Sequence, residues 1–105
     1  MKSSHYSSAP HRENPHGLDA KVLCSIPSAE AIMISLKPGQ NIPPHATPVD
    51  VLFFVHQGEV TIVVDGENEV FSEGSFIESP KNIIHQITNN TNDIARVLVI
   101  KAPRP

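Results

Sequence analysis

Short apolar runs separated by turn residues recur along most of this chain, and they restrict it to a fold built from β-strands. The runs cover residues 21–26, 31–36, 51–55, 60–64, 69–71, 76–78, 83–88 and 94–100. Turn signals such as Lys37-Pro38-Gly39 and Asp65-Gly66 divide them at intervals of about 6–12 residues. No segment has a sustained apolar period of 3.6 residues with helix caps. We therefore expect an all-β sandwich or barrel.

The first part of the chain has a different composition. Residues 1–19 are rich in Ser, His, Pro and Asn and contain almost no large apolar residue. This composition predicts an N-terminal arm that packs late or stays mobile. The spacing of His5, His11 and His16 matches no preformed metal site, and their role is left open. Residues 20–105 are expected to form one barrel domain, whose small size makes help from a partner subunit plausible.

Composition excludes several classes of function. The net charge is −3 and no run of Lys or Arg exists, so we expect no nucleic-acid partner. No apolar run approaches the roughly 20 residues that span a membrane, so we expect no membrane partner. Cys24 is the only cysteine, which rules out a disulfide within one chain and suits a reducing compartment. A cytoplasmic location is therefore expected.

Two stretches carry a histidine in an ordered frame of glycines and prolines. The first contains Gly39, His45, Thr47, Val51 and Gly58, and the second contains Gly74, Pro80, Asn82, His85 and Asn89. They resemble the paired motifs of the cupin superfamily, and the resemblance covers about residues 30–101. It implies a small single-domain cupin with an RmlC-like fold, which is a double-stranded β-helix or jelly-roll barrel. It also implies a pocket, often metal-binding, between the two motifs.

The chain departs from the cupin pattern at three positions. Thr47 stands at the second histidine position, and Val51 stands at the glutamate position, seven residues before Gly58. Asn82 replaces a glycine, and asparagine is the residue that best tolerates the left-handed conformation a glycine would adopt there. The first two departures remove two of the four usual metal ligands of the family.

His45 and His85 are the candidate metal ligands that remain. The resemblance places them on adjacent inner strands, and imidazole suits Zn, Fe or Ni, while a carboxylate would add affinity for Mn. A third ligand would come from Asp50, Thr47, water or substrate. Strict alternation points Asp50 to the opposite face of the strand, although a bulge near Pro48 could redirect it. Its alternative role is a turn or salt-bridge carboxylate, and the alternative for the two histidines is a metal-free hydrogen-bonded pair.

The side chains expected around these histidines indicate the ligand. Phe53, Val55, Ile83 and Ile87 would give the pocket apolar walls, which suit a small hydrophobic or aromatic molecule. His56 has the opposite parity to Val55 and is expected to face outward.

Three classes of function follow. The resemblance implies a metal-dependent enzyme, since cupins include dioxygenases, isomerases and decarboxylases. The alternatives are a non-catalytic small-molecule binding or sensor protein with a degenerate metal site, and a structural protein whose cavity is filled by side chains. Whether the chain is an enzyme stays open.

The apolar run Val51–Val55 predicts a partner subunit. A barrel wall needs only one apolar face, yet this run is apolar on both. The outer face needs cover, most simply from a second subunit's sheet or its N-terminal arm, so we expect a homodimer.

Overall fold

The computed structural model describes residues 1–105, and its regular structure consists of nine β-strands. They are β1 (Asp19–Ile26), β2 (Ala29–Leu36), β3 (Asn41–Ala46), β4 (Asp50–Gln57), β5 (Val60–Val64), β6 (Glu67–Phe71), β7 (Phe76–Ser79), β8 (Ile84–Thr88) and β9 (Ala95–Ala102). The expected all-β fold is confirmed. The structure contains no helix long and apolar enough to cross a membrane.

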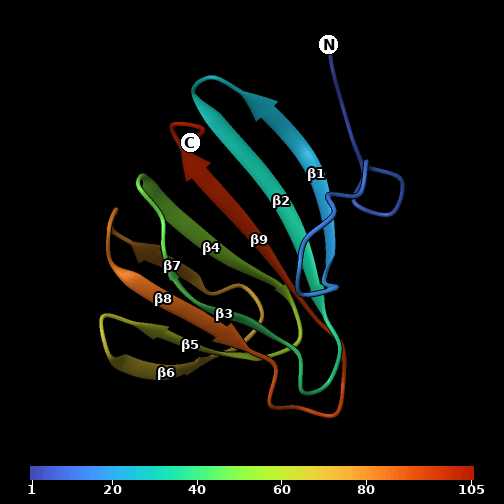
Figure 1. Cartoon of the computed structure of the whole chain (residues 1–105). Helices are drawn as coiled ribbons and strands as arrows, with labels where there is room; N and C mark the ends of the chain where they lie inside the picture. The colour runs from blue at the N-terminus through green and yellow to red at the C-terminus, as the bar shows by residue number, and fades with distance from the viewer.

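The strands form two antiparallel sheets that face each other (Figure 1). One sheet has the order β1-β2-β9-β4-β7, and the other has the order β3-β8-β5-β6. Neighbours in each sheet are often far apart in sequence, as expected for a jelly-roll barrel. The core lies between the sheets and includes Leu36, Val51, Phe53, Val55, Ile62, Ile87 and Val97.

Alternation along β4 explains why its sequence is apolar on both faces. Val51, Phe53 and Val55 point into the core and are buried. Leu52 and Phe54 have the opposite parity and are only half-buried on the outer face. β4 is an interior strand, between β9 and β7, and it carries apolar side chains on both faces of the sheet.

Two turns adopt the backbone that their residues favour. Asp65 and Gly66 both have positive φ, 50° and 80°, and they join β5 to β6 as the expected two-residue hairpin. Asn82 has φ 64°, so it takes the left-handed conformation expected at the glycine position of the cupin pattern. This turn leads directly into β8, which carries His85.

The strand β3 has no counterpart among the apolar runs of the sequence. It contains Pro43 and Pro44, which cannot donate to a ladder, and it is an edge strand of its sheet. Its register with β8 shifts between Ile42 and His45, where the prolines interrupt regular pairing. After this irregularity, His45 pairs directly with His85.

The N-terminal arm packs against the five-stranded sheet. The backbone N–H of Arg12 donates to Ala20, and that of Val22 donates to Pro10, so the arm lies along β1. Leu18 is buried and belongs to the core. Figure 1 shows the arm passing beside β1 and β2, with the first residues projecting from the body. Backbone pairing thus packs this segment against β1, which is one of the two alternatives that its composition left open.

Candidate functional site

The structure brings His45 and His85 together. Their Nε2 atoms lie 3.2 Å apart, and their rings meet edge to face with centroids 4.5 Å apart. His85 is almost completely buried, whereas His45 is exposed at the rim of the barrel. The pair therefore connects the core to solvent.

Hydrogen bonds on the opposite ring nitrogens fix the protonation of the pair. Nδ1 of His45 lies 2.8 Å from the carbonyl oxygen of Pro43 and must donate to it, because a carbonyl only accepts. In the neutral ring, Nε2 of His45 is then bare, and it accepts from Nε2–H of His85. Nδ1 of His85 is bare in turn and accepts from the buried hydroxyl of Ser79 at 2.9 Å. This Ser79–His85–His45 chain satisfies every ring nitrogen.

His85 is held in its neutral form. Burial, together with the positive charges that His45 and Lys101 can carry, lowers its pKa from 6.5 to about 4. The ring of Phe53 contacts it edge to face at 5.2 Å between centroids and forms part of its apolar surroundings. A neutral imidazole retains a lone pair for a metal ion or a proton, which a charged one does not.

Asp50 does not join the histidines. No group of three His, Cys, Asp or Glu side chains is arranged to hold a metal ion. The carboxylate of Asp50 instead accepts the backbone N–H of Lys81 at 3.0 Å, which is the turn role that the sequence left open for it. Its neighbour Val51 points inward, so alternation turns Asp50 the other way. Its coordination of a metal stays a prediction that this arrangement does not favour.

The residues at the two missing ligand positions of the cupin pattern, Val51 and Thr47, have structural roles. Val51 belongs to the apolar core, so a packing role replaces the ligand role at that position. Thr47 is buried, and its carbonyl oxygen accepts the backbone N–H of Asn82. His56 is exposed and contacts Tyr6, which agrees with the expected outward orientation.

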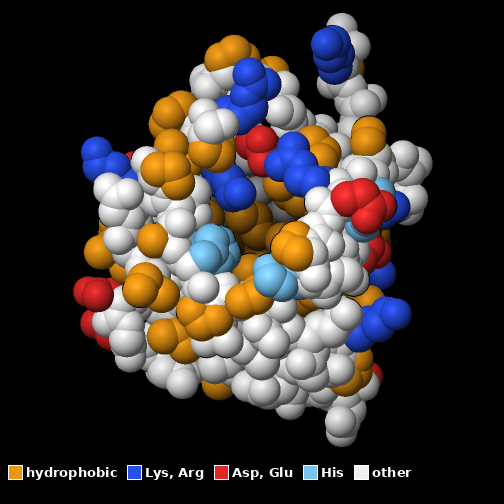
Figure 2. Space-filling model, viewed as in Figure 1, with side chains coloured by type: hydrophobic (Ala, Val, Ile, Leu, Met, Phe, Trp, Pro, Cys, Tyr) orange, Lys and Arg blue, Asp and Glu red, His pale blue; other side chains and the backbone are white.

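A hollow opens at the surface beside the barrel mouth (Figure 2). Its floor is hydrophobic, histidine side chains lie at its rim, and Lys and Arg side chains gather above it. Phe53, Val55 and Ile87 are buried in the core, while Ile83 is only partly buried and lines a separate cavity, so their role as pocket walls stays a prediction. The hollow therefore combines an apolar floor with imidazole and cationic groups.

A separate cavity of about 680 Å³ lies away from the histidine pair. It is lined by β5, β6, β7 and the loop before β8, and its lining includes Asp50, Asp65, Glu67, Glu69 and Glu78. Neither His45 nor His85 lines it. Asp50 therefore belongs to this acidic side cleft rather than to the mouth of the barrel.

Sequence reasoning did not identify three polar residues that the structure brings to the inner side of the barrel. Ser79 hydrogen-bonds to His85, and its position just before Pro80 of the second motif was the available signal. Lys101 stands opposite both Glu30 and the inward-facing Val51, so its parity in β9 places it on the inner face. Arg12 comes from the arm, and no sequence pattern connects it to the barrel.

Residues 32–101 match the model of the cupin domain. The chain belongs to the cupin family. A comparison with curated protein sequences finds no match for it.

Solved structures with the same fold include other cupins. The chain is 20% identical to KdgF from Halomonas sp., with a TM-score of 0.88, covering 100% of this chain and 96% of that one. It is 19% identical to an RmlC-like cupin from Shewanella frigidimarina, with a TM-score of 0.87 and coverage of 99% and 92%. It is 24% identical to TT1209 from Thermus thermophilus, with a TM-score of 0.86 and complete coverage of both chains. At these identities the likeness shows the fold alone.

Proposed function

We propose that this cupin binds a small molecule in the mouth of its barrel, beside a divalent metal ion held by His45 and His85. The observation that carries the proposal is the 3.2 Å separation of the two Nε2 atoms. Bonds from zinc to imidazole nitrogen are about 2.0–2.1 Å long, so one ion can contact both atoms. Zn, Fe and Ni suit such imidazole ligands best.

The hydrogen bonds at Nδ1 also suit a metal ion. Pro43 already holds His45 in the form whose Nε2 is bare. His85 reaches the same form if its proton moves to Nδ1, because the hydroxyl of Ser79 can accept as well as donate. Partners of this kind orient imidazole ligands and set their tautomers in metal sites.

Two imidazoles leave most coordination positions free. We therefore expect weaker binding than at a site with three histidines and a carboxylate, with water or the bound molecule filling the other positions. A bound divalent ion would act there as a Lewis acid toward an oxygen of the ligand. The partly hydrophobic hollow would hold the apolar portion of that ligand.

A second candidate function is small-molecule binding without metal or turnover. It is favoured by the fact that every buried side-chain nitrogen and oxygen already has a hydrogen-bond partner. The Ser79–His85–His45 chain is therefore complete without an ion.

Calorimetric titration with zinc, together with elemental analysis of protein purified without a His-tag, tests the proposal. His45→Ala and His85→Ala should each abolish zinc binding, whereas His56→Ala should leave it intact because His56 is on the outer face. Asp50→Asn should be close to neutral if Asp50 is only a turn residue, and should clearly weaken binding if it is a ligand. Unchanged zinc binding in both His45→Ala and His85→Ala would exclude this metal site and favour the second function.

A further inference from the structure

The inner wall of the five-stranded sheet carries two cationic side chains, Lys101 and Arg12, around the carboxylate of Glu30. Lys101 lies directly opposite Glu30 in the pairing of β9 with β2, and opposite Val51 in the pairing with β4. This register places Lys101 on the inner face of the wall, the face that also carries the buried Val51. Lys101 makes no ion pair, because the only ion pairs in the chain are His11–Glu13 and Arg12–Glu30. Its charge is therefore available to a ligand.

Arg12 reaches the same wall from the N-terminal arm. Its Nη1 donates to Oε1 of Glu30 at 2.5 Å, and the Glu30 side chain is only 6% exposed. The Arg12 side chain is 44% exposed, and this contact is the only one its guanidinium makes within the chain. A guanidinium has five N–H donors, so most of them remain free. Glu30 thus anchors Arg12 and leaves most of its donors unpaired.

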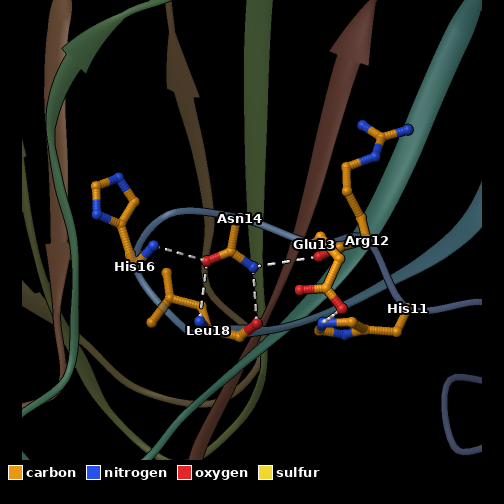
Figure 3. A network of polar contacts seen from close by, with 6 residues as sticks. All are labelled: His11, Arg12, Glu13, Asn14, His16 and Leu18. Carbon is orange, nitrogen blue, oxygen red and sulfur yellow. Dashed lines mark hydrogen bonds and ion pairs between the residues drawn. The ribbon is translucent and has the colours of Figure 1, made fainter.

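The arm is built to hold Arg12 in place. The side chain of Asn14 accepts the backbone N–H groups of Leu18 and His16, and it donates to the carbonyls of Leu18 and Arg12 (Figure 3). Leu18 is buried in the core, which fixes the far end of this loop. Figure 3 shows the Arg12 side chain pointing away from the network. Its position is therefore set before any ligand binds.

We infer that Lys101 and Arg12 form an anion-binding subsite, and that the small molecule bound by this cupin carries a carboxylate on an apolar or aromatic body. The inference rests on the proposed function and names its class of ligand. Two cations against the single carboxylate of Glu30 leave one excess positive charge, which one carboxylate would neutralise. Charge-assisted hydrogen bonds from Lys and Arg are roughly twice as strong as neutral ones, and Arg can bind a carboxylate through two donors. The hydrophobic floor would accommodate the rest of the molecule.

Titration of metal-free protein with benzoate and with its neutral analogue benzamide tests the inference. Benzoate should bind with a Kd on the order of 1 mM, and benzamide about tenfold more weakly or worse. Lys101→Met should weaken benzoate binding about tenfold. Lys21→Met is the matched control and should change nothing, because Lys21 pairs with Met33 on the opposite face of the same sheet.

A double variant tests Arg12 without leaving Glu30 unpaired. Arg12→Gln combined with Glu30→Gln removes both charges and keeps two groups that can hydrogen-bond, so the fold should survive, as a thermal melt would verify. Benzoate binding should again fall about tenfold. Equal affinity for benzoate and benzamide, unchanged binding in Lys101→Met, or no benzoate binding up to about 20 mM would overturn the inference.

Zinc titration of the same proteins separates this inference from the proposed function. Lys101→Met should keep its affinity for zinc while its affinity for benzoate falls. Benzoate binding in a protein that does not bind zinc would remove the metal from the proposed function and leave the anion subsite standing. Zinc binding without benzoate binding would keep the proposed metal site and overturn the anion subsite.

Discussion

At the scale of single residues, the depressed pKa of His85 makes the stability of the fold depend on pH. Its pKa in the folded protein is about 4, below the ordinary value of 6.5. The unfolded chain therefore takes up the proton first as pH falls, and the folded state loses stability between about pH 6.5 and pH 4. The loss ends once the folded form is also protonated. A shift of this size corresponds to at most about 3 kcal/mol.

The His85→Gln variant tests this pH dependence. Glutamine cannot titrate, so the decrease in the free energy of unfolding between about pH 7 and about pH 4.5 should be clearly smaller in the variant than in the wild type. Urea denaturation at both pH values measures it. His56→Gln should retain the wild-type dependence, because His56 lies on the outer face. An identical pH dependence in His85→Gln and the wild type would contradict the assigned cause.

At the scale of strands and turns, the motif glycines have unequal structural roles. Gly58 follows β4 with φ 77°, and a Cβ placed there would lie 2.7 Å from the carbonyl oxygen of Ile94. Gly39 has φ 82°, but a Cβ there would meet nothing within 4 Å. Both positions need a left-handed backbone, whereas only Gly58 needs the absence of a side chain for packing.

The comparison of Gly58→Ala with Gly39→Ala separates these two effects. Gly39→Ala should lower the free energy of unfolding by roughly 1–2 kcal/mol, the cost of the left-handed backbone alone. Gly58→Ala should cost about 3 kcal/mol or more, because the backbone around Ile94 must also move. Urea denaturation of both variants measures the difference. Equal losses in the free energy of unfolding would show that the contact with Ile94 does not contribute to the cost of Gly58→Ala.

Strands that consist of an apolar run bounded by turn residues could be predicted from the sequence. The predicted run 60–64 coincides with β5, and the other predicted runs differ from β1, β2, β4, β6, β7, β8 and β9 only at their ends. The strand β3 could not be predicted, because Pro43 and Pro44 weaken its strand signal and only pairing with β8 holds it. The sequence left open whether the arm packs or stays mobile, since its backbone pairing with β1 leaves no mark on its composition.

The candidate site was only partly accessible to sequence reasoning. The motif frame identified His45 and His85, which the structure places in contact. Lys101 and Arg12 stayed hidden, because their approach to the site depends on strand register and on the path of the arm. Asp50 illustrates the opposite case, in which nearness in sequence to a ligand position did not bring the side chain to the site.

At the scale of the whole molecule, the outer face of the five-stranded sheet predicts self-association. Leu52, Phe54, Leu98 and Ile100 are only half-buried on this face. The arm covers one end of it, where Tyr6 lies against His56 and beneath the guanidinium of Arg96. The apolar remainder is the surface on which we expect a second copy to pack.

Light scattering tests this expectation. The wild type should be a dimer at micromolar concentration, and Phe54→Glu should shift it toward monomer by placing a charge in the apolar face. Val70→Glu is the control, because Val70 is exposed on β6 of the other sheet. A wild type that is monomeric at micromolar concentration would contradict the prediction.

The central claim is that His45 and His85 direct their Nε2 atoms at a shared point where a metal ion can replace a proton. Long-range ¹H–¹⁵N NMR spectra of the histidine rings, recorded with and without zinc near neutral pH, test it most directly. Without zinc, His45 should carry its proton on Nδ1 and His85 on Nε2. With zinc, both rings should carry it on Nδ1, and both Nε2 resonances should shift together. Spectra in which zinc changes neither ring, or only the rings of the N-terminal arm, would contradict the account.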